Sequence, residues 1–159
     1  HLCDRRQRQM CIRDRAYMEA YFATFPGVRR YMDDVVAQAK ERGYVETLFH
    51  RRRELPEIRS SNFNMRSFGE RVALNMPIQG TAADIMKLAM VAVEKRLKRE
   101  LPEAKLVLQV HDELIVECPE PQAAAAAKLL EEEMGQVAHL SVPLTAEAYW
   151  GRNWLEAKG

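Results

Sequence analysis

The stretch that most constrains the fold of this chain is KLVLQVHDELIVEC, residues 105–118. A mostly apolar run, residues 106–110, leads into the polar triplet HDE (residues 111–113), and a second apolar run, residues 114–116, leads out. Short apolar runs rich in Val, Ile and Leu are typical of buried strands. Two such runs separated by three polar residues predict a tight β-hairpin with the triplet at its tip.

The predicted hairpin tip carries side chains that an ordinary turn does not need. Gly, Asn and Pro bend the chain more easily than His111, Asp112 and Glu113, so we interpret the triplet as selected for its chemistry. Two adjacent carboxylates offer hard oxygen ligands, which suit Mg²⁺ and, through the metal, phosphate chemistry. The alternative is a solvated turn with a chance run of polar residues, because short motifs often match by chance.

Length and composition limit the class of protein. With 159 residues, 47% of them hydrophobic and 30% charged, the chain has the size and composition of one soluble globular domain. Its net charge of +1 means that any basic surface must be local. No apolar run reaches the roughly 18 residues that a membrane span needs, and the basic amino terminus lacks the apolar segment of a secretory signal. Three cysteines without a CxxC pair indicate a reducing compartment, so we expect a cytoplasmic protein.

Residues 1–15 differ in character from the rest of the chain. They hold five arginines and two of the three cysteines, with no helical apolar stripe. We interpret them as a disordered basic extension or as sequence foreign to the natural protein.

From residue 16 onward the apolar spacing is regular. It predicts helices and strands, with helices over residues 17–25, 28–43, 66–76, 79–101 and 123–137 and strands over 44–49 and 144–149. Pro77 is expected to kink or stop its helix, the run Glu131–Glu133 to mark a solvated helix face, and Trp150 and Trp154 to cover an edge of the core. Helices packed on one face of a small antiparallel sheet make an α+β fold.

A second group of polar residues lies upstream of the hairpin. Arg71 and Asn75 are four residues apart and share a helix face, and Gln79 continues the spacing beyond Pro77. A guanidinium and two amides in a row suit the purine N3 and pyrimidine O2 acceptors of the DNA minor groove, which every base pair presents. The alternative is a polar stripe on a surface helix. Likewise the basic turn Arg51–Arg53 could hold DNA phosphates or be an ordinary charged turn.

Taken together, these motifs resemble those of a known protein family. ERVALNMPIQGTAADIMKLAM (residues 70–90) followed by LVLQVHDELIVE (residues 106–117) resembles the carboxyl-terminal part of family A DNA polymerases, the bacterial DNA polymerase I group. The upstream YMEAYFATFPGV and GYVETLFHRRRELPEIRSSNFNMRSFGER and the closing VPLTAEAYWGRNW are similar to the same family, in the same order. The resemblance implies that residues 16–159 are the carboxyl-terminal part of a fingers and palm domain: part of the palm with the distal fingers of a right-hand polymerase.

The resemblance also implies roles for single residues. Asp112 would be the palm carboxylate that binds the two Mg²⁺ ions at the primer 3′ end, and Glu113 would lie beside it with a lesser role in metal binding. His111 would approach the primer terminus, and Gln109 would lie near the minor groove. The other implied DNA contacts are those of Arg71, Asn75 and Gln79 with the primer–template minor groove and of Arg52 with the template strand.

The implied function is part of a DNA-directed DNA polymerase of replication and repair. Such an enzyme adds deoxynucleoside triphosphates to the primer strand of primer–template DNA by two-metal phosphoryl transfer, here as an expected monomer without membrane contact. We find no counterpart of the family's first palm motif or of its nucleotide-binding fingers helix, so we expect the isolated chain to be inactive. A non-catalytic DNA-binding module is the alternative. A Mg²⁺-dependent nuclease is disfavoured, because a metal hydrolase needs more ligands than one hairpin tip supplies.

Overall fold

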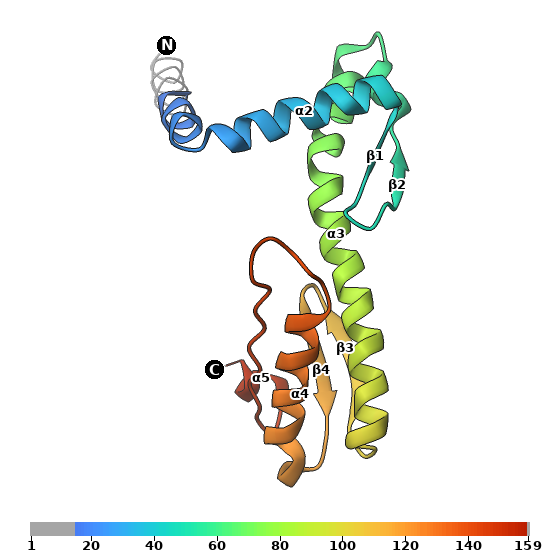
Figure 1. Cartoon of the computed structure of the whole chain (residues 1–159), viewed down its shortest axis with the longest axis vertical. Coiled ribbons are helices and arrows are strands. Elements are labelled where there is room, and N and C mark those ends of the chain that lie inside the picture. The colour runs from blue at the N-terminus through green and yellow to red at the C-terminus, as the bar shows by residue number, and fades with distance from the viewer. Residues whose placement is uncertain (1–14, 159) are drawn as a thin grey trace, which may run out of the picture. The chain divides into compact units, whose positions relative to one another are not determined.

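A computed structural model of the chain describes residues 15–158, which fall into two compact units that meet between Ile78 and Gln79 in the sequence. Residues 15–24 are helical. The elements that follow are helix α2 (Pro26–Arg42), strands β1 (Tyr44–Glu46) and β2 (Arg52–Glu54), 3₁₀ helix η1 (Pro56–Arg59), helix α3 (Phe63–Glu100), strands β3 (Lys105–Val110) and β4 (Glu113–Glu117), 3₁₀ helix η2 (Glu120–Gln122), helix α4 (Ala123–Gln136) and the short helix α5 (Trp154–Ala157) (Figure 1). The predicted segment 1–15 lies outside the described residues except for Arg15.

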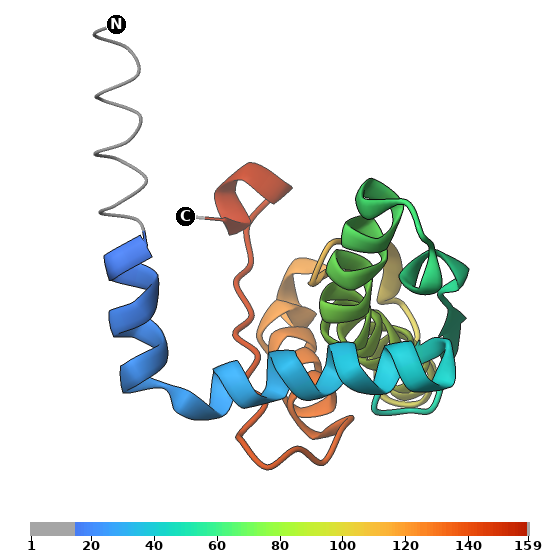
Figure 2. The ribbon, with the colours of Figure 1, turned by 90° about the horizontal axis from the view of Figure 1, so that it is seen from above.

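In the first unit, helix α2 begins and ends where its sequence predicts. Pro26 occupies the first turn, where its missing N–H costs nothing, and α2 sets off at an angle from the preceding helical residues (Figures 1 and 2). Gly43 ends α2 in the left-handed conformation, with φ 84°, and its N–H donates to the carbonyl of Ala39. Arg59 of η1 reinforces this end, because its guanidinium donates to the carbonyls of Lys40 and Glu41.

A small core holds the first unit together. Strands β1 and β2 form an antiparallel hairpin. The buried core residues come from α2, the hairpin, η1 and the first turns of α3: Ala39, Val45, Leu55, Ile58 and Ala73. An ion pair of 2.6 Å between Lys40 and Glu70 adds a polar contact between α2 and α3.

In the second unit, helices pack against the β3–β4 hairpin. The two strands are antiparallel, with Leu106 opposite Val116. Val93 and Leu97 of α3 and Leu129 of α4 form the buried core, against which Leu106, Leu114 and Val116 of the hairpin pack, whereas Val107 remains half exposed. One apolar face of the hairpin is thus covered by helices, which confirms the predicted α+β fold.

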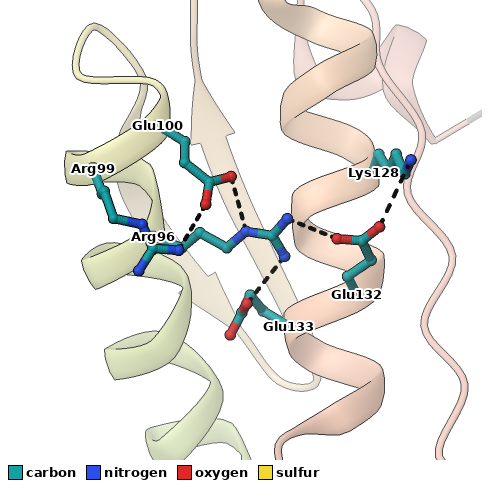
Figure 3. A network of polar contacts seen from close by, with 6 residues as sticks. All are labelled: Arg96, Arg99, Glu100, Lys128, Glu132 and Glu133. Carbon is teal, nitrogen blue, oxygen red and sulfur yellow. Dashed lines mark hydrogen bonds and ion pairs between the residues drawn. The ribbon is translucent and has the colours of Figure 1, made fainter.

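An ion-pair network joins α3 to α4 within the second unit (Figure 3). The guanidinium of Arg96 lies 2.7 Å from Glu132 and 3.1 Å from Glu133 of α4, and 3.0 Å from Glu100 of its own helix. Hydrogen bonds from Arg96 to Glu132, then Glu100 and Glu133, raise the pKa of the guanidinium, and Arg99 together with Arg96 lowers the pKa of Glu100. The prediction of a solvated face at Glu131–Glu133 is therefore wrong for the last two glutamates.

Several local predictions differ from the structure for physical reasons. Helix α3 continues through Pro77, so the prediction that Pro77 stops its helix is wrong, whereas the kink stays a prediction. Buried residues such as Ala73 and Ala89 hold the helix on both sides of the proline. The predicted strand 44–49 ends at Glu46, and the predicted basic turn forms part of β2.

The predicted strand 144–149 is also absent from the described chain. An alternating pattern forms a strand only where its backbone can pair with the free edge of a sheet. Here the backbone N–H of Ala148 instead donates to the Glu131 carboxylate. Trp150 and Trp154 are 62% and 44% exposed, so the prediction that they cover the core is wrong.

Gly69 provides a test of the contact between α3 and η1. A Cβ atom at Gly69 would lie 2.8 Å from the backbone nitrogen of Ile58 and 2.9 Å from its Cα, whereas one at Gly27 would meet nothing within 4 Å. Both glycines are helical, so both alanine variants gain helix propensity. We expect Gly69→Ala to lower the free energy of unfolding by about 1–3 kcal/mol and Gly27→Ala to leave it unchanged or raise it by up to about 1 kcal/mol.

Urea unfolding of the two variants beside the parent chain measures the difference. Equal free energies of unfolding for the two variants would contradict the close packing of α3 on η1.

Candidate metal and nucleic-acid site

The turn between β3 and β4 consists of two residues. Val110, the last residue of β3, pairs with Glu113, the first residue of β4, which leaves His111 and Asp112 as the loop. The prediction of a three-residue tip is therefore corrected by one position. His111 has φ 54°, in the left-handed region that non-glycine residues rarely adopt. Two-residue hairpin loops require positive φ values, so His111 adopts this conformation because the loop is so short.

A hydrogen bond from the side chain of Gln109, in β3, stabilises the turn. Its side-chain Nε2 donates to the carbonyl oxygen of His111 at 2.5 Å. The residue that the resemblance associates with the minor groove thus has a defined intramolecular partner.

Asp112 and Glu113 are neighbours in the sequence but differ in their surroundings. The Asp112 side chain is exposed and makes no hydrogen bond or ion pair with another residue in the described part of the chain. The Glu113 carboxylate lies 3.2 Å from Nζ of Lys158, which also lies 5.2 Å from the ring centroid of Trp154. Asp112 therefore offers an open carboxylate, and Glu113 offers one that a cation already partly neutralises.

Lys158 is the residue of this group that sequence reasoning missed. It lies just after α5, far along the chain from the hairpin. No spacing in the sequence indicates this pairing, because a contact between distant segments leaves no periodic signal.

The donor chemistry at the tip fits part of a Mg²⁺ site. An exposed aspartate and a neighbouring glutamate are hard oxygen ligands of the kind that Mg²⁺ prefers. Among residues 15–158 no group of three or more His, Cys, Asp or Glu side chains is placed to hold a metal ion. The turn thus offers one or two candidate ligands rather than a complete coordination sphere.

The predicted minor-groove residues all lie on α3. Arg71, Asn75 and Gln79 follow one another at steps of four residues and are exposed. Helical geometry places Arg71 and Asn75 on one face, and the Arg71 guanidinium donates to the hydroxyl of Ser67 at 3.1 Å. The planar donors of α3 are therefore open to a ligand.

Arg52 has partners within the chain. In strand β2 its guanidinium stacks 4.6 Å over the ring of Tyr44 and lies 3.3 Å from the carboxylate of Glu46. A DNA phosphate would have to compete with Glu46 for this cation, so the predicted template contact of Arg52 remains a prediction.

Comparison with known proteins places the chain in a family. The sequence profile of DNA polymerase family A matches residues 11–156, so the chain belongs to this family. DNA polymerase I of Bacillus caldotenax is 53% identical over 142 residues, which cover 89% of this chain and 16% of that protein. DNA polymerase I of Streptococcus pneumoniae serotype 4 is 51% identical over 144 residues, which cover 91% of this chain and 16% of that protein.

A solved structure agrees with the sequence comparison. The POL domain of Pol1 from M. smegmatis, in complex with DNA primer–template and dNTP, matches with a TM-score of 0.86 and 46% identity over 89% of this chain and 25% of that chain. The present chain thus spans about a sixth of the length of the DNA polymerase I relatives that it matches. The family match begins at residue 11, inside the segment 1–15, whose interpretation remains a prediction. No helix in the described part of the chain combines the length and the apolar character of a membrane span.

Proposed function

We propose that this chain is the carboxyl-terminal palm and distal-fingers part of a DNA-directed DNA polymerase, which extends a primer 3′ end on a template with deoxynucleoside triphosphates. The observation that carries the proposal is the two-residue turn, which presents an unpaired Asp112 carboxylate at the end of an apolar hairpin. The likeness to a polymerase domain whose structure contains primer–template DNA and dNTP supports it.

In this proposal Asp112 is the principal metal ligand and Glu113 a secondary one. The open Asp112 carboxylate can bind a cation without first giving up a partner, whereas Glu113 must share its charge with Lys158. These carboxylates would hold Mg²⁺, which when bound would supply Lewis-acid chemistry at the primer 3′-hydroxyl and positive charge beside the phosphates. The chain's own task is to hold these carboxylates at a fixed position on a rigid hairpin.

The tip supplies too few ligands to complete the proposed metal site. Two adjacent carboxylates are the donors it brings, and the described residues place no third acidic or imidazole ligand beside them. We therefore propose that activity needs further residues of a longer polymerase and that the isolated chain does not extend primers.

The α3 donors have a separate task in the proposal. Arg71, Asn75 and Gln79 contact minor-groove acceptors that all base pairs share and that mismatches displace. A non-catalytic DNA-binding module, the alternative function, would keep these contacts but give the Asp112 carboxylate no role.

The test of the Asp112 role uses a chimera in which this chain replaces the matching segment of Bacillus caldotenax DNA polymerase I. We expect Asp112→Asn to lower turnover about 100-fold or more, because a metal contact worth several kcal/mol in the transition state is lost. We expect Glu113→Gln to have a smaller effect. Single-turnover primer extension measures both variants.

The control is the dissociation constant for primer–template DNA, measured on the same variants. It should change little, because DNA binding depends on contacts elsewhere. Matching losses of turnover and of DNA affinity in Asp112→Asn would contradict a catalytic role, and unchanged turnover would favour the DNA-binding module.

Gln79 tests the minor-groove contacts in the same chimera. We expect Gln79→Ala to slow extension of matched primers about tenfold, the effect of losing a hydrogen bond worth about 1.4 kcal/mol in the transition state. It should also change the ratio of matched to mismatched extension, because mismatches displace the acceptors.

Gln38→Ala is the matched control, since Gln38 is also an exposed glutamine within a helix. Both variants should keep the melting temperature of the parent, and Gln38→Ala should keep its kinetics. If Gln79→Ala leaves the rate and the discrimination unchanged, Gln79 does not belong to the site.

A further inference from the structure

The turn that presents Asp112 combines backbone strain with a side-chain hydrogen bond. His111 is left-handed, with φ 54°, which costs free energy for a residue that has a Cβ atom. The carbonyl of the same residue lies outside the strand ladder and accepts a hydrogen bond of 2.5 Å from the Gln109 side chain. This hydrogen bond therefore adds to the Val110–Glu113 pairing that closes the strained turn.

A second turn in the chain repeats this combination. His50, with φ 62°, is the other non-glycine residue of the described chain with positive φ. Its turn is closed by the Thr47 hydroxyl, which accepts from the N–H groups of Phe49 and Arg51, both at 3.2 Å. In each case a polar side chain just before the left-handed histidine binds the backbone of the turn.

The two turns differ in how their polar side chain is itself held. Thr47 is buried, with 3% of its surface exposed, so packing fixes it. Gln109 is exposed, so its hydrogen bond to the His111 carbonyl is the contact that defines its position.

We propose that Gln109 is a positioning residue, whose amide holds the left-handed turn at His111 and thereby fixes the direction in which the Asp112 side chain leaves the backbone. Asp112 has no partner of its own among the described residues, so the backbone of the turn, which sets the direction of the Cα–Cβ bond, is what places this side chain. Gln109 acts through the His111 carbonyl and needs no contact with DNA or metal for this task. The catalytic consequence depends on the proposed function, whereas the conformational claim does not.

The proposal makes a prediction about two substitutions that should interact. Gln109→Met keeps the length of the side chain and removes the donor. His111→Gly removes the cost of the left-handed conformation, so the turn no longer needs the Gln109 hydrogen bond. The effect of Gln109→Met should therefore be large with His111 present and small in the His111→Gly background.

The first measurement uses the chain itself and does not involve catalysis. NMR spectra of the chain should show shifted and broadened amide signals for residues 111–113 in Gln109→Met. The double variant should match His111→Gly. Unchanged signals in Gln109→Met, or the same disturbance in both backgrounds, would overturn the proposal.

The second measurement follows the Mg²⁺ dependence of extension in the chimera. Gln109→Met should raise the Mg²⁺ concentration for half-maximal rate about 3- to 10-fold, the size of one net hydrogen bond, while DNA affinity stays constant. In the His111→Gly background the same substitution should change it less than about twofold.

The two measurements distinguish the failure of this proposal from that of the proposed function. Weaker DNA binding in Gln109→Met, equal in both backgrounds, would mean that Gln109 contacts DNA directly and would overturn the positioning role. If the NMR result holds but Asp112→Asn leaves extension unchanged, the proposed function fails and the conformational role of Gln109 stands.

Discussion

The packing of the β3–β4 hairpin against α3 and α4 is the interaction on which the candidate site depends. Val93 and Leu97 of α3 meet Leu129 of α4 and one apolar face of the hairpin. A two-stranded hairpin is marginal in water unless such a face is buried. Because β3 is anchored through Leu106 and β4 through Leu114 and Val116, the two residues beyond the strands project as a short turn.

The two neighbouring carboxylates at this turn, Asp112 and Glu113, differ in their charged surroundings. Lys158 lies against Glu113 and leaves Asp112 open. The ion pair is about half exposed, so it adds little to stability. Its importance is local, because it gives two chemically similar neighbours different charged surroundings.

The sequence predicts those parts of the fold that depend on local pattern. The apolar runs around residues 111–113 predict the hairpin, and Pro26 and Gly43 mark both ends of α2. Predictions fail where contacts with distant segments determine the structure. Pro77 does not stop α3, and residues 144–149 find no strand beside them in the described chain. Within the site, the tip residues can be predicted as a motif. The Lys158 contact and the Gln109 hydrogen bond become visible only in the folded structure.

The most direct test of the central claim maps the metal itself. In the chimera, Fe²⁺ replaces Mg²⁺ in the presence of primer–template DNA, and ascorbate with hydrogen peroxide generates hydroxyl radicals that cut the polypeptide beside the bound ion. Mass spectrometry locates the cuts. The account predicts cleavage within residues 110–114 that disappears in Asp112→Asn. Cleavage confined to other segments, or cleavage at the turn that survives Asp112→Asn, would contradict the assignment of Asp112 as a metal ligand.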